Sequence, residues 1–212
     1  MHLDLTVILP LHNGQQYLRE TLDSAASEAP KGVRFLAYDS SDNGGDAASL
    51  VSEFANRLDV RYASTPDIKP WQDKVNLGFK EATTPLVAIL HQDDLWLPGH
   101  LDAVQQSFNL NPGAVMSIGP SRFIDARSRY VGAWKLPFDP GLVGGRNFAE
   151  KLIVQNTIAV PSVVYLRQAW LDAGGMDRNL WYTPDWDIYL ALARFGDIAV
   201  RPSATTAFRL HG

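Results

Sequence analysis

The sequence predicts an α/β fold built on a mostly parallel, Rossmann-type sheet flanked by helices. Two observations carry this prediction. Short apolar runs alternate with stretches of helical periodicity through the first half of the chain. Several of these runs also end directly in polar loops, which is typical of strands whose carboxyl ends hold a ligand. With 212 residues, 46% of them hydrophobic, the chain is long enough to bury the core of one such domain.

Alternating strands and helices are expected over the first half of the chain. The apolar runs predict strands over residues 6–9, 33–38, 60–62 and 86–90, and helical spacing predicts helices over 17–26, 47–58 and 72–82. This order favours parallel strands joined by helices on both faces. The polar loops after Leu9, Tyr38 and Leu90 should therefore gather at one edge of the sheet.

The second half has a less regular pattern. It predicts a helix over 101–110, a strand over 114–118, a hairpin over 122–134, a glycine-rich joint over 141–146, a strand over 163–166 and a helix over 185–194. Neither a repeat nor a low-complexity linker interrupts the sequence. We therefore expect residues 1–212 to form a single domain.

Composition and charge exclude several classes of function. Lys and Arg number 19 against 23 Asp and Glu, giving a net charge of −4 without a basic run, so nucleic acid is not an expected partner. The absence of cysteine excludes disulfides and thiolate metal sites. No signal peptide and no membrane-spanning stretch is recognised. We expect a cytoplasmic protein, a location that includes peripheral attachment at the inner face of the membrane.

The most informative cluster is His91-Gln92-Asp93-Asp94, which follows an apolar strand. Adjacent carboxylates at a strand end could hold Mg²⁺ or Mn²⁺, which prefer oxygen ligands and often share them with substrate phosphates. The alternative is that Asp93 or Asp94 merely caps the next turn. The position at the carboxyl end of a strand favours the metal site.

A second polar cluster, residues 39–46, follows the second predicted strand. Taken alone it is a turn-rich loop. Its place after a strand also allows Asp39 to accept hydrogen bonds from a nucleotide base or ribose.

The third cluster surrounds Asp185. Thr183 and Pro184 form a suitable helix start, and a carboxylate in the first turn is stabilised by the helix dipole. Asp185 could also act as a general base held rigidly at that helix start. The dipole lowers the pKa of a carboxylate and so weakens it as a base.

Weaker signals come from isolated residues. Lys74 and Asn76 lie on the helix before the Asp93 strand, and either could simply be solvated. Six tryptophans could stack on sugars, although core packing is their commoner role. His211, near the end of the chain, could be a metal or phosphate ligand or a surface histidine.

Together, in their order and spacing, these segments resemble the family 2 glycosyltransferases. The segments are Val7-Ile8-Leu9-Pro10-Leu11-His12-Asn13-Gly14, Tyr17-Leu18-Arg19-Glu20-Thr21-Leu22, Asp39-Ser40-Ser41-Asp42-Asn43-Gly44, Lys74-Val75-Asn76-Leu77-Gly78, His91-Gln92-Asp93-Asp94, Gly174-Gly175-Met176-Asp177 and Trp181-Tyr182-Thr183-Pro184-Asp185-Trp186-Asp187. Each is weak alone, but the series covers nearly the whole chain.

The resemblance implies a GT-A-like fold and an inverting, metal-dependent glycosyltransferase. Residues from 1 to about 112 would bind a nucleotide-sugar donor, with a UDP-sugar favoured, and those from about 113 to 212 would form an acceptor-side extension. Donor contacts would come from Asp39, Lys74, Asn76, His91 and Asp93. The metal, Mn²⁺ or Mg²⁺, would bind Asp93 and His211, and Asp185 would be the catalytic base.

Three positions depart from the family pattern. His91 stands where the metal motif has its first aspartate, Pro184 replaces the glutamate before the base, and Ala191 replaces a common arginine. An imidazole can still ligate Mn²⁺ or donate to a hydroxyl. His91 and Pro184 each remove a carboxylate from the family pattern, which should affect the strength of metal binding and the activity.

The implied role is the transfer of a sugar to a saccharide or lipid-linked saccharide acceptor, in polysaccharide or glycoconjugate synthesis. The departures keep open a binding module of the same fold that no longer transfers sugar. A nucleotidyltransferase would release pyrophosphate instead. An oxidoreductase ranks last, because the loop after the first strand offers one glycine, Gly14, where a dinucleotide site needs a glycine-rich turn.

Overall fold

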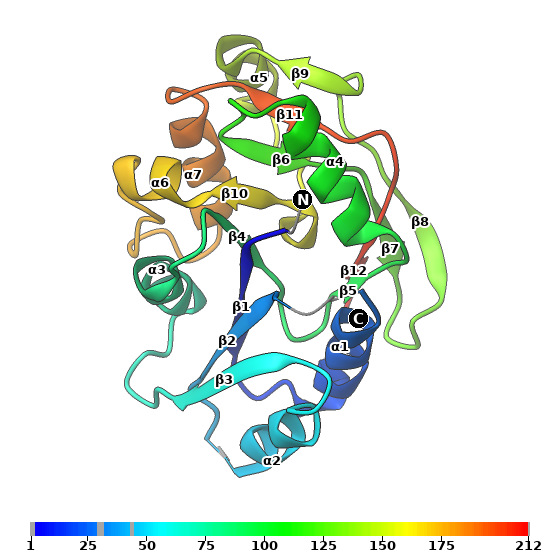
Figure 1. Ribbon diagram of the computed structural model, residues 1–212, viewed down its shortest axis with the longest axis vertical. Coiled ribbons are helices and arrows are strands. Elements are labelled where there is room, and N and C mark those ends of the chain that lie inside the picture. Colours follow the sequence, from blue (N-terminus) through cyan, green and yellow to red (C-terminus); the bar gives the residue numbers. More distant parts are fainter. Residues whose placement is uncertain (1–2, 29–31, 43–44, 212) are drawn as a thin grey trace.

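An eight-stranded mixed sheet runs through the molecule and confirms the α/β class (Figure 1). The computed structural model describes residues 3–28, 32–42 and 45–211. In spatial order the strands of this sheet are β3 (Asp59–Ser64), β2 (Arg34–Asp39), β1 (Leu5–Leu11), β4 (Leu86–Ile89), β10 (Val164–Leu166), β6 (Met116–Ile118), β11 (Ile198–Val200) and β9 (Gly141–Val143).

The parallel part of this sheet is the part that the sequence pattern predicts. β3, β2, β1 and β4 are parallel neighbours, because a helix returns the chain across the sheet between successive strands. β10 is antiparallel to both β4 and β6, and β9 is antiparallel to β11, so the sheet is more mixed than expected. β9 also occupies part of the predicted glycine-rich joint, which is therefore a strand followed by a helix.

A smaller four-stranded sheet lies beside the first, in the order β5 (Leu95–Trp96), β12 (Thr206–Arg209), β7 (Ser121–Ile124) and β8 (Tyr130–Trp134). β7 and β8 form the antiparallel hairpin predicted from the sequence. β12 pairs with β5, which directly follows the Asp93-Asp94 loop. This pairing brings the last residues of the chain next to that loop.

Helices cover both faces of the large sheet (Figure 1). One core contains side chains of α1 (Gln15–Glu28), α2 (Gly45–Glu53) and α4 (His100–Leu110). The other contains side chains of α3 (Trp71–Glu81), α5 (Gly145–Leu152), α6 (Arg167–Asp172) and α7 (Pro184–Leu192). β1 contributes side chains to both cores, because Ile8 packs in the second core and Val7 and Leu9 pack in the first. A short 3₁₀ turn, η1 (Val160–Ser162), precedes β10.

Close packing of α3 against β1 depends on Gly78. A Cβ added to this glycine would lie 2.6 Å from Cδ1 of Ile8, so a larger residue would push the helix away from the strand. Lys74, one turn earlier on α3, is thereby held against the end of β1. Among the described residues, no helix combines the length and apolar character needed to cross a membrane.

Candidate active site

The loops that follow β1, β2 and β4 meet at one edge of the sheet, as predicted. The side chain of Gln92 accepts a hydrogen bond from the backbone nitrogen of His12 and donates one to its carbonyl oxygen, both at 2.9 Å. The His12 ring in turn lies 3.1 Å from the carbonyl oxygen of Ser40. Three loops distant in sequence are therefore joined into one rim.

Asp39 lies buried at the end of β2, inside this rim. Its Oδ1 accepts hydrogen bonds from the backbone and the hydroxyl of Ser41, at 2.8 and 2.6 Å. Its Oδ2 accepts one from the Tyr62 hydroxyl at 2.7 Å. Burial, followed by the Asp39 hydrogen bond and charge, raises the pKa of Tyr62. The carboxylate is thus fixed in orientation by groups of its own chain.

Lys74 projects from α3 to the same edge and is buried rather than solvated. Its Nζ donates to the carbonyl oxygen of Leu11 at 2.6 Å. Burial lowers the pKa of this amine to about 8, and the nearby Asp39 charge acts in the opposite direction. Lys74 lines the cleft described below, so its positive charge faces the ligand space.

Asn76 lies further along α3 and faces the loop that precedes α7. Its Nδ2 donates to the carbonyl oxygen of Met176 at 2.8 Å, and its Oδ1 accepts from the Met176 nitrogen at 2.9 Å. Both ends of the amide are therefore used to hold backbone. The structure does not bring Asn76 together with the cleft-lining residues.

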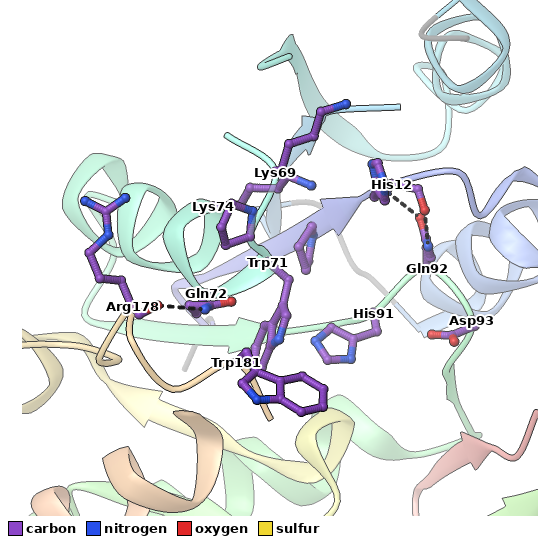
Figure 2. Close-up of a pocket in the computed structure, with 12 residues that line it drawn as sticks. His12, Lys69, Trp71, Gln72, Lys74, His91, Gln92, Asp93, Arg178 and Trp181 are labelled. Atoms are coloured by element: carbon purple, nitrogen blue, oxygen red, sulfur yellow. Dashed lines mark hydrogen bonds between the residues drawn. The ribbon is translucent and has the colours of Figure 1, made fainter. Parts of the chain in front are cut away.

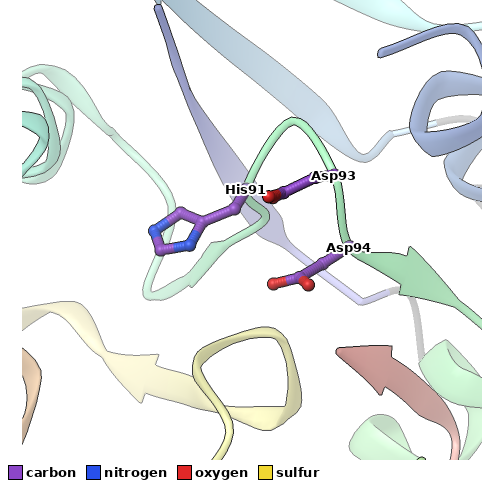
Figure 3. Close-up of side chains that lie close together, drawn as sticks. All are labelled: His91, Asp93 and Asp94. Carbon is purple, nitrogen blue, oxygen red and sulfur yellow. The ribbon is translucent and has the colours of Figure 1, made fainter. Parts of the chain in front are cut away.

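His91, Asp93 and Asp94 form a potential metal-binding group on the loop between β4 and β5 (Figure 3). One ligand atom from each lies within 4.8 Å of the other two. Nε2 of His91 and Oδ2 of Asp94 are buried and make no hydrogen bond to the described residues. Burial, together with the Asp93 charge, raises the pKa of Asp94 well above its ordinary value. A divalent cation bound by this group would stabilise the buried carboxylate of Asp94.

Arg209 holds the Asp93-Asp94 loop in place. Its backbone nitrogen donates to Oδ1 of Asp94 at 3.1 Å, and its Nε donates to the carbonyl oxygen of Asp93 at 2.8 Å. The guanidinium is fully buried, pairs with Glu20 at 2.8 Å and lies over the Tyr17 ring. β12 therefore carries a rigid support for the potential metal site.

The imidazole of His211 contacts Asp93 directly. Its Nε2 lies 2.6 Å from Oδ2 of Asp93, and its ring packs 5.5 Å from the ring of Tyr17, centroid to centroid. The structure thus brings together the two residues predicted as metal ligands, from positions 118 residues apart.

Asp185 lies at the start of α7, as predicted, and is largely buried. Asn156 donates from Nδ2 to its Oδ2 at 2.8 Å. Burial raises the pKa of Asp185, while the Asn156 hydrogen bond is the largest of the influences that lower it. Thr183 precedes the helix but makes no side-chain capping bond. A raised pKa suits a group that must accept a proton near neutral pH.

An open cleft of about 610 Å³ lies at this edge of the sheet, and His12, Lys74, His91, Gln92 and Asp93 are among the residues that line it (Figure 2). Lys69, Lys74 and Arg178 line it against the single carboxylate Asp93, and two of these cations are in ion pairs, Lys69 with Asp42 at 2.8 Å and Arg178 with Asp73 at 3.1 Å. His91 contacts Trp71 edge to face, at 4.9 Å between ring centroids. Asp185 does not line the cleft, but its charge raises the pKa of His91, and the charge of His91 lowers the pKa of Asp185. A cationic cleft beside buried carboxylates suits a ligand with phosphate groups and a bound metal.

Several residues of this site were not predicted from the sequence, among them His12, Gln92, Asn156 and Arg209. Gln92 and Arg209 lie within or beside segments already singled out, but their partners are 80 and 116 residues away. Asn156 lies in an irregular segment whose sequence carries no motif. Polar side chains in such segments become informative only when the fold places a partner beside them.

Comparison with known proteins agrees with this geometry. The family model described as Glycosyl transferase family 2 matches residues 6–172. A Rickettsia typhi protein named as an uncharacterized glycosyltransferase is 22% identical over 98% of this chain and 64% of its own length. An uncharacterized Mycobacterium tuberculosis protein is 26% identical over 98% of this chain and 59% of its own.

Solved structures show the same fold. The Staphylococcus aureus protein TarS, residues 1–349, superposes with a TM-score of 0.79 at 17% identity, over 98% of this chain and 60% of that one. Its complex with UDP-GlcNAc gives a TM-score of 0.80 at 16% identity, over 99% and 59%. The chain thus spans about 60% of these solved chains.

Proposed function

The chain belongs to glycosyl transferase family 2, and from this premise we propose that it transfers a sugar from a nucleotide-sugar donor to an acceptor hydroxyl. The observation that carries the proposal is the cleft lined by Lys69, Lys74 and Asp93, together with the partly buried Asp185, whose charge and that of His91 influence each other. The cations suit a diphosphate, and the two carboxylates suit a metal and a proton acceptor.

A uridine nucleotide is the donor that we favour. TarS, which has the same fold, has been solved with UDP-GlcNAc and with UDP. In this chain, Asp39 lies at the end of β2 with its carboxylate fixed by Ser41 and Tyr62, ready to accept from a base N–H. Lys74 and Lys69 line the cleft together with Asp93, and their amines suit the diphosphate.

The residues present fit a divalent cation, Mn²⁺ or Mg²⁺. Asp93 and Asp94 offer carboxylate oxygens, while His91 and His211 offer imidazole nitrogens within reach of Asp93. Imidazole ligands favour a transition metal over Mg²⁺, so Mn²⁺ fits this donor set better. When bound, the cation would neutralise charge on the leaving nucleoside diphosphate.

The protein's own groups would carry the proton transfer and the positioning. Asp185 accepts the proton of the acceptor hydroxyl, whose oxygen attacks the anomeric carbon from the face opposite the diphosphate, so that configuration inverts. Asn156 holds one oxygen of this carboxylate at 2.8 Å. We assign to His91, which lines the cleft, the contact with the ribose. Asn76 would act indirectly, because it fixes the backbone of Met176 in the loop before α7.

The two halves of the chain would divide the work. Residues from 1 to about 112 carry the donor-side groups, and the remainder carries Asn156 and Asp185 on the acceptor side. The acceptor that we propose is a saccharide or lipid-linked saccharide, met in the cytoplasm or at the inner face of the membrane during polysaccharide or glycoconjugate synthesis.

The alternative is a module that binds the nucleotide sugar without transferring it. Pro184 removes a carboxylate beside the base, and His91 removes one from the metal motif, which supports this alternative. The hydrogen bond from Asn156 that fixes the Asp185 carboxylate at 2.8 Å supports the enzyme, because a general base must be held in orientation.

A thermal-shift panel of nucleotide sugars, with and without Mn²⁺, followed by a nucleoside-diphosphate release assay, tests the proposal. We expect UDP-sugars with Mn²⁺ to raise the Tm and to be turned over. A Tm shift without release of UDP, in the presence of a broad set of saccharide acceptors, would support the binding module. No shift with any nucleotide sugar would contradict both.

A further inference from the structure

The aromatic pair Trp181 and Tyr182 stands almost entirely in solvent at the rim of the cleft. Their side chains are 81% and 77% exposed, and their ring centroids are 5.4 Å apart. Trp181 lines the cleft together with His91 and Trp71. Large aromatic residues left exposed beside a binding cleft commonly serve as contact points for a ligand.

The loop that carries this pair is firmly attached to α3. Asn76 binds the backbone of Met176 from both ends of its amide. Gln72 donates from Nε2 towards the carbonyl oxygens of Arg178 and Leu180, at 3.3 and 3.4 Å. α7 begins directly after the pair, at Pro184. The exposed indole is therefore presented by a fixed backbone, which reduces the entropy lost when a ligand binds.

The position of the pair favours the acceptor over the nucleotide. The groups suited to the base and the diphosphate are His12, Asp39 and Lys69, which belong to the loops after β1, β2 and β3. Figure 2 shows Trp181 well away from His12 and Lys69, and Trp181 lines the cleft together with His91. Trp181 also precedes Asp185 by only four residues. An acceptor hydroxyl that reaches Asp185 must bring the rest of its molecule past this rim.

We propose that Trp181, flanked by Tyr182, is a stacking platform for a sugar ring of the acceptor; the inference rests on the proposed function. The C–H face of a pyranose is apolar and matches the face of an indole, while the ring hydroxyls remain hydrated or reach the indole N–H and the tyrosine hydroxyl. This assigns a saccharide, rather than a small alcohol or a protein hydroxyl, as the group next to the reacting hydroxyl.

Affinity for simple glycosides tests the platform without knowledge of the natural acceptor. Methyl glycosides of glucose, galactose, mannose and N-acetylglucosamine are titrated by NMR, up to roughly 100 mM, in the presence of UDP and Mn²⁺. We expect at least one to bind the wild type. Trp181→Ala should weaken that binding roughly tenfold or more, whereas Trp181→Phe, which keeps an aromatic face, should stay within about threefold.

Two controls separate the possible outcomes. Tyr130→Ala removes another exposed aromatic residue, on β8 and outside the cleft lining, and should leave glycoside affinity unchanged. Calorimetry with UDP should give the same affinity for all variants. Failure of the wild type to bind any glycoside, normal binding by Trp181→Ala, or loss of UDP affinity in that variant would each overturn the platform. Absence of UDP binding by the wild type would instead contradict the proposed function.

Discussion

The side-chain amide of Asn156 donates a hydrogen bond from Nδ2 to Oδ2 of Asp185 at 2.8 Å. Its own Oδ1 accepts from the backbone nitrogen of Ile158, so the amide cannot rotate freely. One carboxylate oxygen of Asp185 is thereby fixed, and backbone N–H groups at the start of α7 also donate to this carboxylate. This amide supports the carboxylate from a neighbouring loop, at a site where Pro184 offers no side-chain support from the helix.

Asn156→Ala should shift the acidic limb of the pH–rate profile to higher pH. Asn156 lowers the pKa of Asp185 against the larger effect of burial, and the charge of His91 lowers it too. Without the amide the carboxyl holds its proton to higher pH, and a protonated carboxyl cannot act as a base. A hydrogen bond to a charged group contributes about 1.5–3 kcal/mol, so a loss of roughly tenfold in kcat is expected below the new pKa.

The measurement is kcat against pH for the wild type, Asn156→Ala and a control, Asn109→Ala, which changes an exposed asparagine on α4. The control should retain the wild-type profile. A uniform loss of rate at all pH values in Asn156→Ala, with the limb unmoved, would assign Asn156 a purely structural role.

Asp93→Ala should abolish metal-dependent binding of UDP without unfolding the protein. Asp93 is the cleft-lining carboxylate of the potential metal site, and its side chain is partly exposed, so the fold does not depend on it. Changes in residues that merely support a metal ligand cost about 10- to 100-fold in affinity, and loss of a ligand should cost at least as much. Calorimetry with UDP and Mn²⁺ measures this. Asp102→Ala, on the exposed face of α4, is the control, and unchanged affinity in Asp93→Ala would remove Asp93 from the site.

Arg209→Lys should destabilise the protein. The buried guanidinium donates to the backbone of Asp93 and Asp125 and pairs with Glu20, and an ammonium cannot reproduce this planar set of donors. Breaking such a buried network lowers the free energy of unfolding by roughly 3 kcal/mol.

Urea denaturation of Arg209→Lys measures this loss. The control Arg129→Lys changes an exposed ion pair and should shift stability by less than about 1 kcal/mol. Equal stabilities for the two variants would contradict the supporting role of Arg209.

The parallel half of the sheet could be predicted because its signals are local. Each apolar run is also a strand, and the loops after β1, β2 and β4 lie at one edge as expected, where His91 and Asp93 lie close together. The helix start at Pro184 could likewise be predicted, because its signals lie in adjacent residues.

The remaining features depend on contacts that are distant in sequence. β9, β11 and β12 contain only three or four residues each, too few for a clear period, and are stabilised by their neighbours in the sheets. The partners of Asn156 and Arg209 follow from where these short strands and their loops are placed. Asn76 likewise bonds the backbone of Met176, which is 100 residues away in sequence.

UDP should bind more tightly than GDP or thymidine diphosphate. The buried Asp39 carboxylate, fixed by Tyr62, would accept from the N3–H of uracil, whereas guanine presents a different edge and thymidine diphosphate carries an extra methyl group and lacks the ribose 2′-hydroxyl. We expect a preference of about tenfold or more, narrowed in Asp39→Asn, where an amide group replaces one acceptor oxygen. Calorimetry with the three diphosphates decides this, and tighter binding of GDP or thymidine diphosphate by the wild type would contradict the uridine assignment.

Asp185→Asn and Asp187→Asn should affect the reaction very differently. Asp187 follows by two residues, about 200° further round the helix at 3.6 residues per turn, and the structure leaves it exposed while Asp185 is largely buried. The asparagine at 185 can still accept from Asn156 but is no longer a base, so transfer should fall by roughly 10² to 10⁴ while UDP and Mn²⁺ bind normally. Asp187→Asn removes a favourable charge from the first turn of α7 and should cost under about 1 kcal/mol of stability, with little change in rate. Transfer rate, UDP affinity and urea midpoint are measured for both variants. A near-normal rate in Asp185→Asn would exclude it as the base, and a large rate loss confined to Asp187→Asn would transfer the role to that residue.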